Sequence, residues 1–436
     1  MGASAVPRAL VRRLTVISTV AAMLVAAACG GATTSSGGGN TQSRGGTSSA
    51  SPRSGGVTDY LSFVGGKSGQ ADQNLSPIAI GWVNAQGGPV AFPEATSAAQ
   101  AAVKYVNAEL GGVGGHPLQL DTCFIANAEE EGQKCGQQLI ADKNVAGVAF
   151  GAVVTGNQSF ASVINGQKTV MIGVSVAPSD SVHPNYFLLY GSSTSVLGPW
   201  GTYGKNVLHA KTAAEIYPNQ AGSTDAEAAL KAGMEKAGIK VKSVGYNPQA
   251  TDLLGPLTAA GAQTADMVVP ATDAPGCINA AKALKEIGRT KNIVPPPLCL
   301  SAPVMQALGD FPLWTYGIAQ TLPTDTTAAD AVTYVNTATK YGLSKADSAQ
   351  VFAALAWAEI LTYVKFMNAI GADKITTEAL AQQFKAFRGP LIMGAPNVQC
   401  GKYKSQPAVC NDQTKFYNYE GKGVFKAVTG YITPPG

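Results

Sequence analysis

The chain is poor in the side chains that most often carry catalysis. It has only three histidines, His116, His183 and His209, and they stand far apart. It has no CxxC pair, no HExxH, no GxSxG, no P-loop and no GxGxxG after a strand. A general base, a zinc site or a nucleotide-binding loop needs such groups at such spacings. We therefore expect no enzyme, no metal and no cofactor, and the sequence leaves open only a catalytic pair of carboxylates.

Charge and long apolar runs are also scarce. Charged residues make up 13% of the chain, and three charges of the formal +4 belong to Arg8, Arg12 and Arg13, which leaves +1 for the rest. A nearly neutral body without a basic run has no electrostatic footprint for nucleic acid. Beyond residue 28 no apolar run approaches the length of a membrane span. We expect neither a nucleic-acid partner nor a spanning helix in the body.

The first 28 residues have the layout of an export signal. The three arginines precede an uncharged run of 15 residues, 14–28, which ends in three alanines. This run is shorter than the about 20 residues of a membrane span, and small residues at its end are typical of a cleavage site. Because Cys29 follows directly, the leader resembles a bacterial lipoprotein signal, although Ala26 stands where such signals usually have Leu. An ordinary secretory signal is the alternative.

The segment behind Cys29 is a predicted tether. Residues 30–56 are almost wholly Gly, Ser, Thr and Asn, with a few Arg, Pro, Ala and Gln, and cannot bury a core. As a coil, about 27 residues would reach roughly 30 Å. We expect 1–28 to be a signal peptide and 29–72 to be an acylated cysteine with a disordered tether. The protein would then be lipid-anchored to the outer face of the cytoplasmic membrane.

The other six cysteines fall into three local pairs. Six cysteines allow 15 connectivities in principle, but each local pair lies within one predicted structural unit, and an exported protein folds in an oxidising setting. Closing a loop the size of the first pair would stabilise the fold by about 3 kcal/mol in the chain-entropy model. The predicted disulfides are Cys123–Cys135, Cys277–Cys299 and Cys400–Cys410.

Strands and helices alternate along the body, which favours an α/β fold with parallel sheets. Strands are predicted at 77–83, 118–124, 145–150, 169–174, 186–190, 212–217, 241–246, 267–269 and 298–300. Helices are predicted at 94–110, 129–141, 225–237, 253–263 and 276–287, with a long helical region at 328–366 interrupted at Gly342. Residues 397–436 are expected to form short strands and loops.

Five segments carry a family resemblance through their order and spacing. They are PIAIGWVNAQGGPVAFPEA, VNAELGGVGGHPLQLDTC, VAGVAFGAVVTGNQS, KTVMIGVSVAPSD and NYFLLY, and the similarity extends over about 77–425. Together they resemble the type I periplasmic-binding fold of branched-chain amino acid (leucine/isoleucine/valine) receptors of ABC transporters. The resemblance implies two doubly wound parallel-sheet lobes joined by a three-segment hinge, with a ligand cleft between them. Lobe one would be 73–192 with 325–390, and lobe two 193–324 with 391–436.

The resemblance also implies site residues in lobe one. The family holds the ligand's charged groups with the loops after the third and fourth strands, and it places an aromatic lid in the first strand–helix loop. The matching residues are Phe92, Thr155, Gly156, Asn157, Ser175, Val176 and Ala177. Thr155 and Asn157 are equally suited to capping a helix, and Phe92 to simple packing. The hinge would lie near 191–195, 321–326 and 388–397.

Lobe two departs from the amino acid receptors. Where they use an aromatic residue, the nearest position here is Gln220, and their acidic partner for the ligand ammonium is replaced by Ser301, Ala302 and Pro303. Asp273 is the one carboxylate placed to substitute for it, with helix capping as its alternative role. The ligand would then be an amino acid, an amide or a small carboxylate. We expect a monomeric solute-binding protein that serves the permease of an ABC importer, with a ligand sensor as the alternative.

Overall fold

The computed structural model describes residues 56–88, 91–153, 155–173, 175 and 177–436. The predicted export signal, Cys29, the predicted tether up to residue 55 and Val176 lie outside the described residues. The described residues belong to one compact unit. Within this unit the strands assemble into two groups, which we call the first and second lobes.

The first lobe is built on a five-stranded, wholly parallel sheet. Its strands are β1 (Ile78–Ala85), β2 (Leu118–Ile125), β3 (Val145–Phe150), β4 (Thr169–Ile172) and β5 (Tyr186–Leu188). They lie in the order β2-β1-β3-β4-β5. This order is that of a doubly wound sheet, in which the chain changes direction between β1 and β3.

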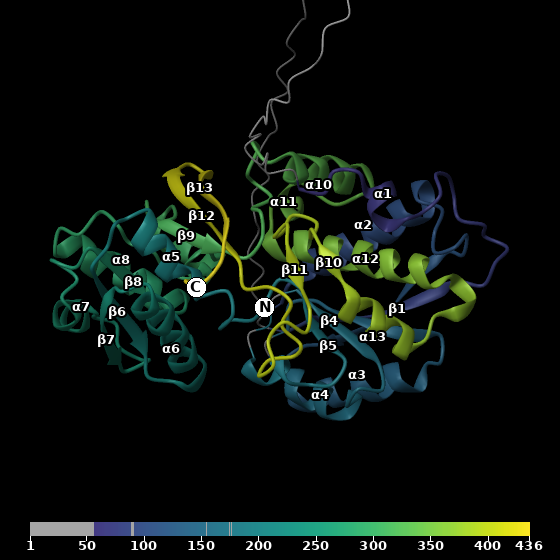
Figure 1. Cartoon of the computed structure of the whole chain (residues 1–436), viewed down its shortest axis with the longest axis horizontal. Helices are drawn as coiled ribbons and strands as arrows, with labels where there is room; N and C mark the ends of the chain where they lie inside the picture. The colour runs from purple at the N-terminus through teal and green to yellow at the C-terminus, as the bar shows by residue number, and fades with distance from the viewer. Residues whose placement is uncertain (1–55, 89–90, 154, 174, 176) are drawn as a thin grey trace, which may run out of the picture. The chain divides into compact units, whose positions relative to one another are not determined.

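Helices cover both faces of this sheet (Figure 1). Ile80 and Trp82 pack with α2 (Pro93–Glu109), α12 (Val351–Ile370) and α13 (Thr377–Ala386). The alternate residues, Ala79 and Val83, pack with α3 (Glu129–Ala141) and α4 (Asn157–Ile164). Successive strand residues point to opposite faces, so the nearly continuous apolar run of β1 serves two cores. The predicted α/β class with parallel sheets is confirmed.

The predicted tether extends too far, because ordered structure begins well before residue 72. Helix α1 (Tyr60–Val64) starts at Asp59, whose side chain accepts a hydrogen bond from the Ser62 N–H at 3.0 Å. Tyr60 and Val64 are buried, and the Tyr60 ring lies 6.0 Å from those of both Tyr105 and Trp357. These apolar contacts hold the segment in the first core. Helices α10 (Ala329–Lys340) and α11 (Lys345–Ser348) pack on α2 on this side of the lobe. The lobe also contains the short turns η1 (Pro178–Ser181), next to β5, and η3 (Ala372–Lys374), next to α12.

The second lobe contains two smaller sheets. The first is parallel, β7-β6-β8, with β6 (Thr212–Pro218), β7 (Lys240–Tyr246) and β8 (Met267–Pro270). The second is antiparallel, β13-β12-β9, with β9 (Thr315–Ile318), β12 (Thr414–Gly421) and β13 (Val424–Ile432). The helices are α5 (Pro199–Asn206), α6 (Ala221–Lys236), α7 (Leu254–Ala260), α8 (Ala274–Glu286) and α9 (Ala302–Leu308).

Two sequence predictions for this lobe are wrong. The expected strand at 298–300 is a 3₁₀ turn, η2 (Pro297–Cys299). Pro295 and Pro296 precede this turn and Pro297 begins it, and proline cannot donate to a strand ladder. The C-terminal block holds two long paired strands of 8 and 9 residues where short strands and loops were expected.

The lobe boundary at residue 391 is also wrong, because the segment 391–410 packs with the first lobe. Strand β10 (Arg388–Gly389) pairs with β11 (Val398–Gln399), and Leu391 and Val398 are buried in the first core. Leu188 of β5 bridges to Val409. The third connection between the lobes therefore runs through 411–414, where β12 begins, and not through 388–397.

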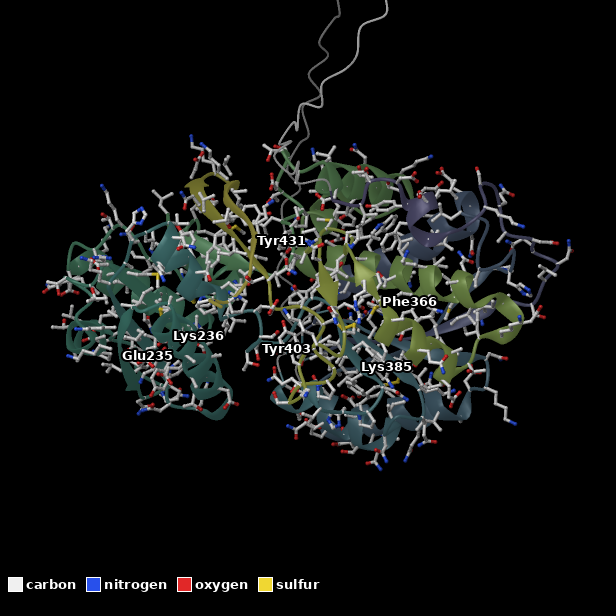
Figure 2. All side chains as sticks on the ribbon, in the orientation of Figure 1. Glu235, Lys236, Phe366, Lys385, Tyr403 and Tyr431 are labelled. Atoms are coloured by element: carbon white, nitrogen blue, oxygen red, sulfur yellow. A yellow bond between two sulfur atoms is a disulfide. The ribbon has the colours of Figure 1, made fainter. Side chains whose placement is uncertain are left out.

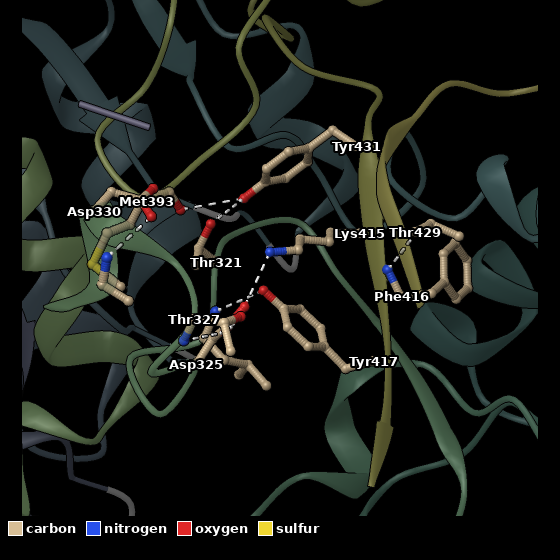
Figure 3. Close-up of polar contacts among 12 residues, drawn as sticks. Thr321, Asp325, Thr327, Asp330, Met393, Lys415, Phe416, Tyr417, Thr429 and Tyr431 are labelled. Atoms are coloured by element: carbon tan, nitrogen blue, oxygen red, sulfur yellow. Dashed lines mark hydrogen bonds and ion pairs between the residues drawn. The ribbon is translucent and has the colours of Figure 1, made fainter. Parts of the chain in front are cut away.

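Polar contacts join the connecting segments (Figure 3). Lys415 Nζ lies 3.1 Å from Asp325 Oδ2, and both side chains are almost fully buried. The Thr321 hydroxyl lies 3.0 Å from the Tyr431 hydroxyl, and the Leu322 N–H donates to the Tyr417 hydroxyl at 3.3 Å. The chain between β9 and α10 is thus tied to β12 and β13 by side chains.

All three predicted disulfides are confirmed. Cys123 on β2 is bonded to Cys135 on α3, and Cys277 on α8 to Cys299 in η2. Cys400 and Cys410 close the loop after β11. Each bond therefore stays within one lobe, as expected from the local pairing. No helix within the part of the chain that the structure describes is long and apolar enough to cross a membrane.

Candidate functional site

Polar and aromatic groups gather at the carboxyl ends of β1, β3 and β4. Because these strands are parallel neighbours, the loops that follow them meet at one edge of the sheet, the edge at which open α/β sheets bind ligands. The fully buried Asn84 joins two of these loops. Its Nδ2 donates to the Phe92 carbonyl at 2.8 Å, and its Oδ1 accepts from the Ala152 N–H at 3.1 Å. Sequence reasoning missed this residue, although an amide in an apolar strand is a visible signal.

Phe92 lies in the loop between β1 and α2, directly before the helix. Its ring packs against that of Phe352 on α12, with the centroids 4.6 Å apart. The residue therefore has a packing role, and the lid role remains a prediction. Both rings belong to the edge formed by the strand ends, because the Phe92 carbonyl is held by Asn84.

The segment from Thr155 to Asn157 leads into α4. Gly156 has φ +81°, a conformation that favours glycine, and its N–H donates to Glu129 Oε1 at 2.9 Å. This N–H is therefore already engaged by the protein. The helix has no side-chain cap, so Thr155 and Asn157 do not cap it. Asn157 is only 9% exposed, and its amide forms no hydrogen bond with another described residue. Both polar side chains remain candidates for ligand contact.

Ser175 and Ala177 form a turn after β4. The Ser175 hydroxyl donates to Asp180 Oδ2 at 2.6 Å and lies 3.2 Å from the Ala177 nitrogen. Burial raises the pKa of Asp180, and the Ser175 hydrogen bond opposes this rise. The backbone of Ser175 is also paired, with Gly191 and Ser193. Ser175 therefore organises the turn, and its contact with ligand remains a prediction.

The two predicted residues of the second lobe lie at one edge of its parallel sheet. Gln220 follows β6 and Asp273 follows β8, and these strands are neighbours. Asp273 caps α8, since its Oδ1 accepts from the Gly276 N–H at 3.1 Å. Gln220 is exposed, and its Nε2 lies 3.3 Å from the Ser223 hydroxyl oxygen. The capping role considered for Asp273 is thus observed, and the ligand role of both residues stays untested.

A small cavity of about 20 Å³ opens at the same edge of the first sheet. Gly151 follows β3 and Gly173 follows β4, and α12 supplies the other walls; the full lining is Gly151, Ala152, Gly173, Phe352, Leu355, Ala356 and Glu359. Glu359 is the only charged residue in this lining. Sequence reasoning missed it, although it is a lone acid inside the apolar run ALAWAEILTYV.

A larger cavity of about 370 Å³ lies between α1, α12 and α13. Phe366, labelled in Figure 2, is one of its walls. Two of its polar groups are committed to α1, because Lys365 Nζ donates to the Phe63 carbonyl and Asn368 Nδ2 to the Val64 carbonyl, both at 3.0 Å. It lies away from the strand ends. We therefore take the smaller cavity and its surrounding loops as the candidate site, despite the difference in size.

The described residues contain no group of three or more His, Cys, Asp or Glu side chains that could hold a metal ion. The polar groups at the strand ends are hydroxyls, amides, backbone N–H groups and the buried carboxyl groups of Asp180 and Glu359. Such groups recognise an organic molecule by hydrogen bonds.

The family model for periplasmic binding proteins matches residues 77–405. The chain therefore belongs to the periplasmic binding protein family, and the predicted type I resemblance is confirmed. The family and the similar structures are those of solute-binding proteins, not of enzymes. Among curated proteins, none matches the chain.

Solved structures with the same fold cover most of the chain. A leucine-binding protein from Thermotoga maritima is 13% identical, with a TM-score of 0.64 over 83% of this chain and 99% of the other. A solute-binding protein of an ABC transporter from Rhodopseudomonas palustris, in complex with p-hydroxybenzoic acid, is 15% identical, with a TM-score of 0.66 over 82% and 98%. A fatty acid ABC transporter substrate-binding protein from Thermomonospora curvata is 14% identical, with a TM-score of 0.61 over 84% and 95%.

Proposed function

We propose that this protein captures a small organic acid, amide or amino acid outside the cytoplasm and delivers it to the permease of an ABC importer. The observation that carries the proposal is the convergence of three loops at the carboxyl ends of β1, β3 and β4, two of which Asn84 ties together. Sheets of this kind bind ligands at that edge. The residues proposed to contact ligand are those predicted from the sequence in both lobes.

The ligand class is proposed from the groups present. Thr155 and Asn157 offer a hydroxyl and an amide beside the start of α4, and such donors suit a carboxylate or an amide carbonyl. The similar structures include proteins for leucine, a fatty acid and hydroxybenzoate. Each of those ligands carries a carboxyl group, which supports an acid as the first choice for this chain.

A thermal-shift screen over amino acids, amides and small carboxylates tests the binding function. A ligand at 100 times its Kd should raise the free energy of unfolding by about 2.7 kcal/mol. A screen in which none of these compounds raises the unfolding temperature would contradict the proposed ligand class. Turnover of a ligand by the purified protein would contradict a pure binding function.

We propose further that Cys29 anchors the protein to the membrane through lipid and that the protein acts as a monomer. A Cys29→Ala variant of the full chain should leave the membrane fraction and appear in the soluble extracytoplasmic fraction. Retention of this variant at the membrane would refute the lipid anchor. Stable anchoring needs more than one acyl chain, because a single chain binds only marginally.

A ligand sensor that passes its signal to a membrane kinase is the second candidate, since the same fold can serve both roles. The gene neighbourhood separates them, because import requires permease and ATPase genes. Deleting the gene for the protein should abolish uptake of labelled ligand if the import proposal holds. Unchanged uptake with a lost transcriptional response would favour the sensor.

A further inference from the structure

The side chain of Glu359 is buried in the small cavity with half of its hydrogen-bonding capacity unused. Glu359 is 2% exposed, in the middle of the apolar helix α12. The Gly173 N–H bonds to the carboxyl group, but Oε2 has no hydrogen-bond partner. A buried polar atom without a partner destabilises the fold. The described residues include no cation paired with Glu359.

The environment of the carboxyl group favours its neutral form. The lining of the cavity is otherwise glycine, alanine, leucine and phenylalanine. The titratable groups that face Glu359 are Tyr363, one turn further along α12, and Tyr190, after β5. Neither can neutralise a carboxylate. Burial raises the pKa of Glu359 well above its ordinary value, which favours the protonated form, and in that form Oε2–H would be a donor without an acceptor.

The cavity has room for only a small group. About 20 Å³ accommodates one water-sized group, and the backbone donors beside it are occupied, since the Gly151 N–H bonds to the Val83 carbonyl and the Ala152 N–H to Asn84. A carboxylate placed here would face a single donor in an apolar wall. An uncharged oxygen needs only that one donor.

We propose that Glu359 is a specificity-determining residue whose carboxylic acid donates a hydrogen bond to an uncharged oxygen, a hydroxyl or a carbonyl, at one end of the ligand. This inference rests on the proposed binding function and deepens it. The ligand class becomes acids or amides that carry a second, uncharged oxygen, which enters between Gly173 and Glu359. Phe352 lines the cavity and its ring contacts that of Phe92, so both rings lie beside this entry.

Two substitutions at the same position separate this proposal from its alternatives. Glu359→Gln keeps a donor of nearly the same shape, whereas Glu359→Met removes it. The matched control is Glu378→Gln, which changes an exposed carboxyl group in the first turn of α13. Gly173→Ala is a further probe, because its Cβ would come within 2.8 Å of Glu359 Oε1 and would reduce the space for a ligand oxygen.

The binding experiment uses matched probes: 4-hydroxybenzoate and benzoate, 4-methyl-2-oxopentanoate and 4-methylpentanoate, and L-leucine. Titration calorimetry should show tighter binding for the oxygen-bearing member of at least one pair. Its Kd should rise about tenfold in Glu359→Met, as expected for a lost hydrogen bond with an unpaired group left behind, and also in Gly173→Ala. It should change less than threefold in Glu359→Gln and in the control.

Two binding results would overturn the proposal. Equal affinity in wild type, Glu359→Gln and Glu359→Met would mean that the cavity holds only water. A preference for L-leucine that both substitutions abolish would mean that Glu359 is a carboxylate paired with the ligand ammonium.

A second measurement needs no ligand. The unfolding temperature of ligand-free Glu359→Met should equal or exceed that of wild type, because the substitution removes a buried group with an unused donor. A lower unfolding temperature in Glu359→Met, together with a wild-type value in Glu359→Gln, would make Glu359 a structural group and refute the proposal. If no probe binds the wild type, the proposed ligand class fails, and this stability measurement alone decides the role of Glu359.

Discussion

At the scale of single residues, the buried acid on α12 is where stability and binding conflict. An ordinary core position at the middle of such a helix would be apolar, and an acid without a full set of partners weakens the ligand-free fold. Groups held in unfavourable surroundings are common at functional sites. The position of Glu359 beside Gly151 and Gly173, at two neighbouring strand ends, is consistent with that pattern.

The acid also predicts a pH dependence of stability. The pKa of Glu359 is raised in the folded protein, so above the unfolded value of about 4.5 the unfolded chain releases a proton that the folded chain keeps. Stability should therefore fall as pH rises from 4.5 towards the folded pKa, by up to about 1.4 kcal/mol per pH unit. Glu359→Gln should flatten this fall in urea unfolding measured between pH 5 and 8.

Part of the fall in stability with pH should remain in every variant, because other buried acids also have raised pKa values. These acids are Asp180, Glu215 and Asp330. The relevant quantity is therefore the difference in slope between wild type and Glu359→Gln. Identical slopes would show that Glu359 is ionised in the folded protein. That outcome would contradict its role as a donor.

At the scale of elements, the first lobe was predicted well because the sequences of its strands are apolar runs. Val145–Phe150 matches its predicted bounds, and Leu118–Ile125 differs by one residue. Glycines and polar residues lie at both ends of these runs and mark where the strands begin and end. The positions of the site loops could be predicted from the strand ends together with the family resemblance. The hydrogen bonds of these loops could not be predicted, because only the packed structure brings their partners Glu129 and Asp180 into contact with them.

Two of the elements that were missed, α5 and α1, lack such local signals. Helix α5, PWGTYGKN, contains two glycines and is a poor intrinsic helix. It is held by tertiary contacts, since Trp200 and Tyr203 pack on Phe416 of β12. Helix α1 has five residues and follows a polar, glycine-rich stretch, so composition alone suggested a tether. The sequence placed the long helical region that contains Glu359, but only the packed structure shows that α12 turns this acid towards the strand ends.

The connecting segments contain an ion pair that should matter for stability. Asp325 and Lys415 are buried together, and although burial opposes it, the Thr327 hydrogen bond and Lys415 lower the pKa of Asp325. Removing one partner of a buried pair costs about 3–5 kcal/mol. Asp325→Asn and Lys415→Met should each destabilise the protein in chemical denaturation. Stability of the wild type should also fall with acid as pH drops through the folded pKa of Asp325.

The double variant provides the control for this pair. Asp325→Asn combined with Lys415→Met leaves no charge unpaired, so this double variant should lose less stability than either single variant. Additive losses in the double variant would mean that the two side chains do not act as a pair. They would then have separate structural roles in the connection.

At the scale of the whole molecule, two lobes joined by three connections allow a closing motion around a ligand. A ligand favours closure only through contacts with both lobes, which the proposed residues Thr155 and Asp273 would supply. We therefore expect the radius of gyration in small-angle X-ray scattering to decrease when a saturating ligand is added. A tightly bound ligand that leaves the scattering curve unchanged would contradict the two-lobe site.

The central claim is that ligand binds at the strand ends of the first lobe and not in the larger cavity beside α1. The most direct test is titration calorimetry of the best compound from the screen against Thr155→Ala and Gln383→Ala, one variant from each location. We predict that Thr155→Ala weakens binding about tenfold or more, as the loss of a hydrogen bond to a charged group costs about 1.5–3 kcal/mol, whereas Gln383→Ala leaves the Kd unchanged. Unchanged binding in Thr155→Ala with weakened binding in Gln383→Ala would contradict the claim and move the site to the larger cavity.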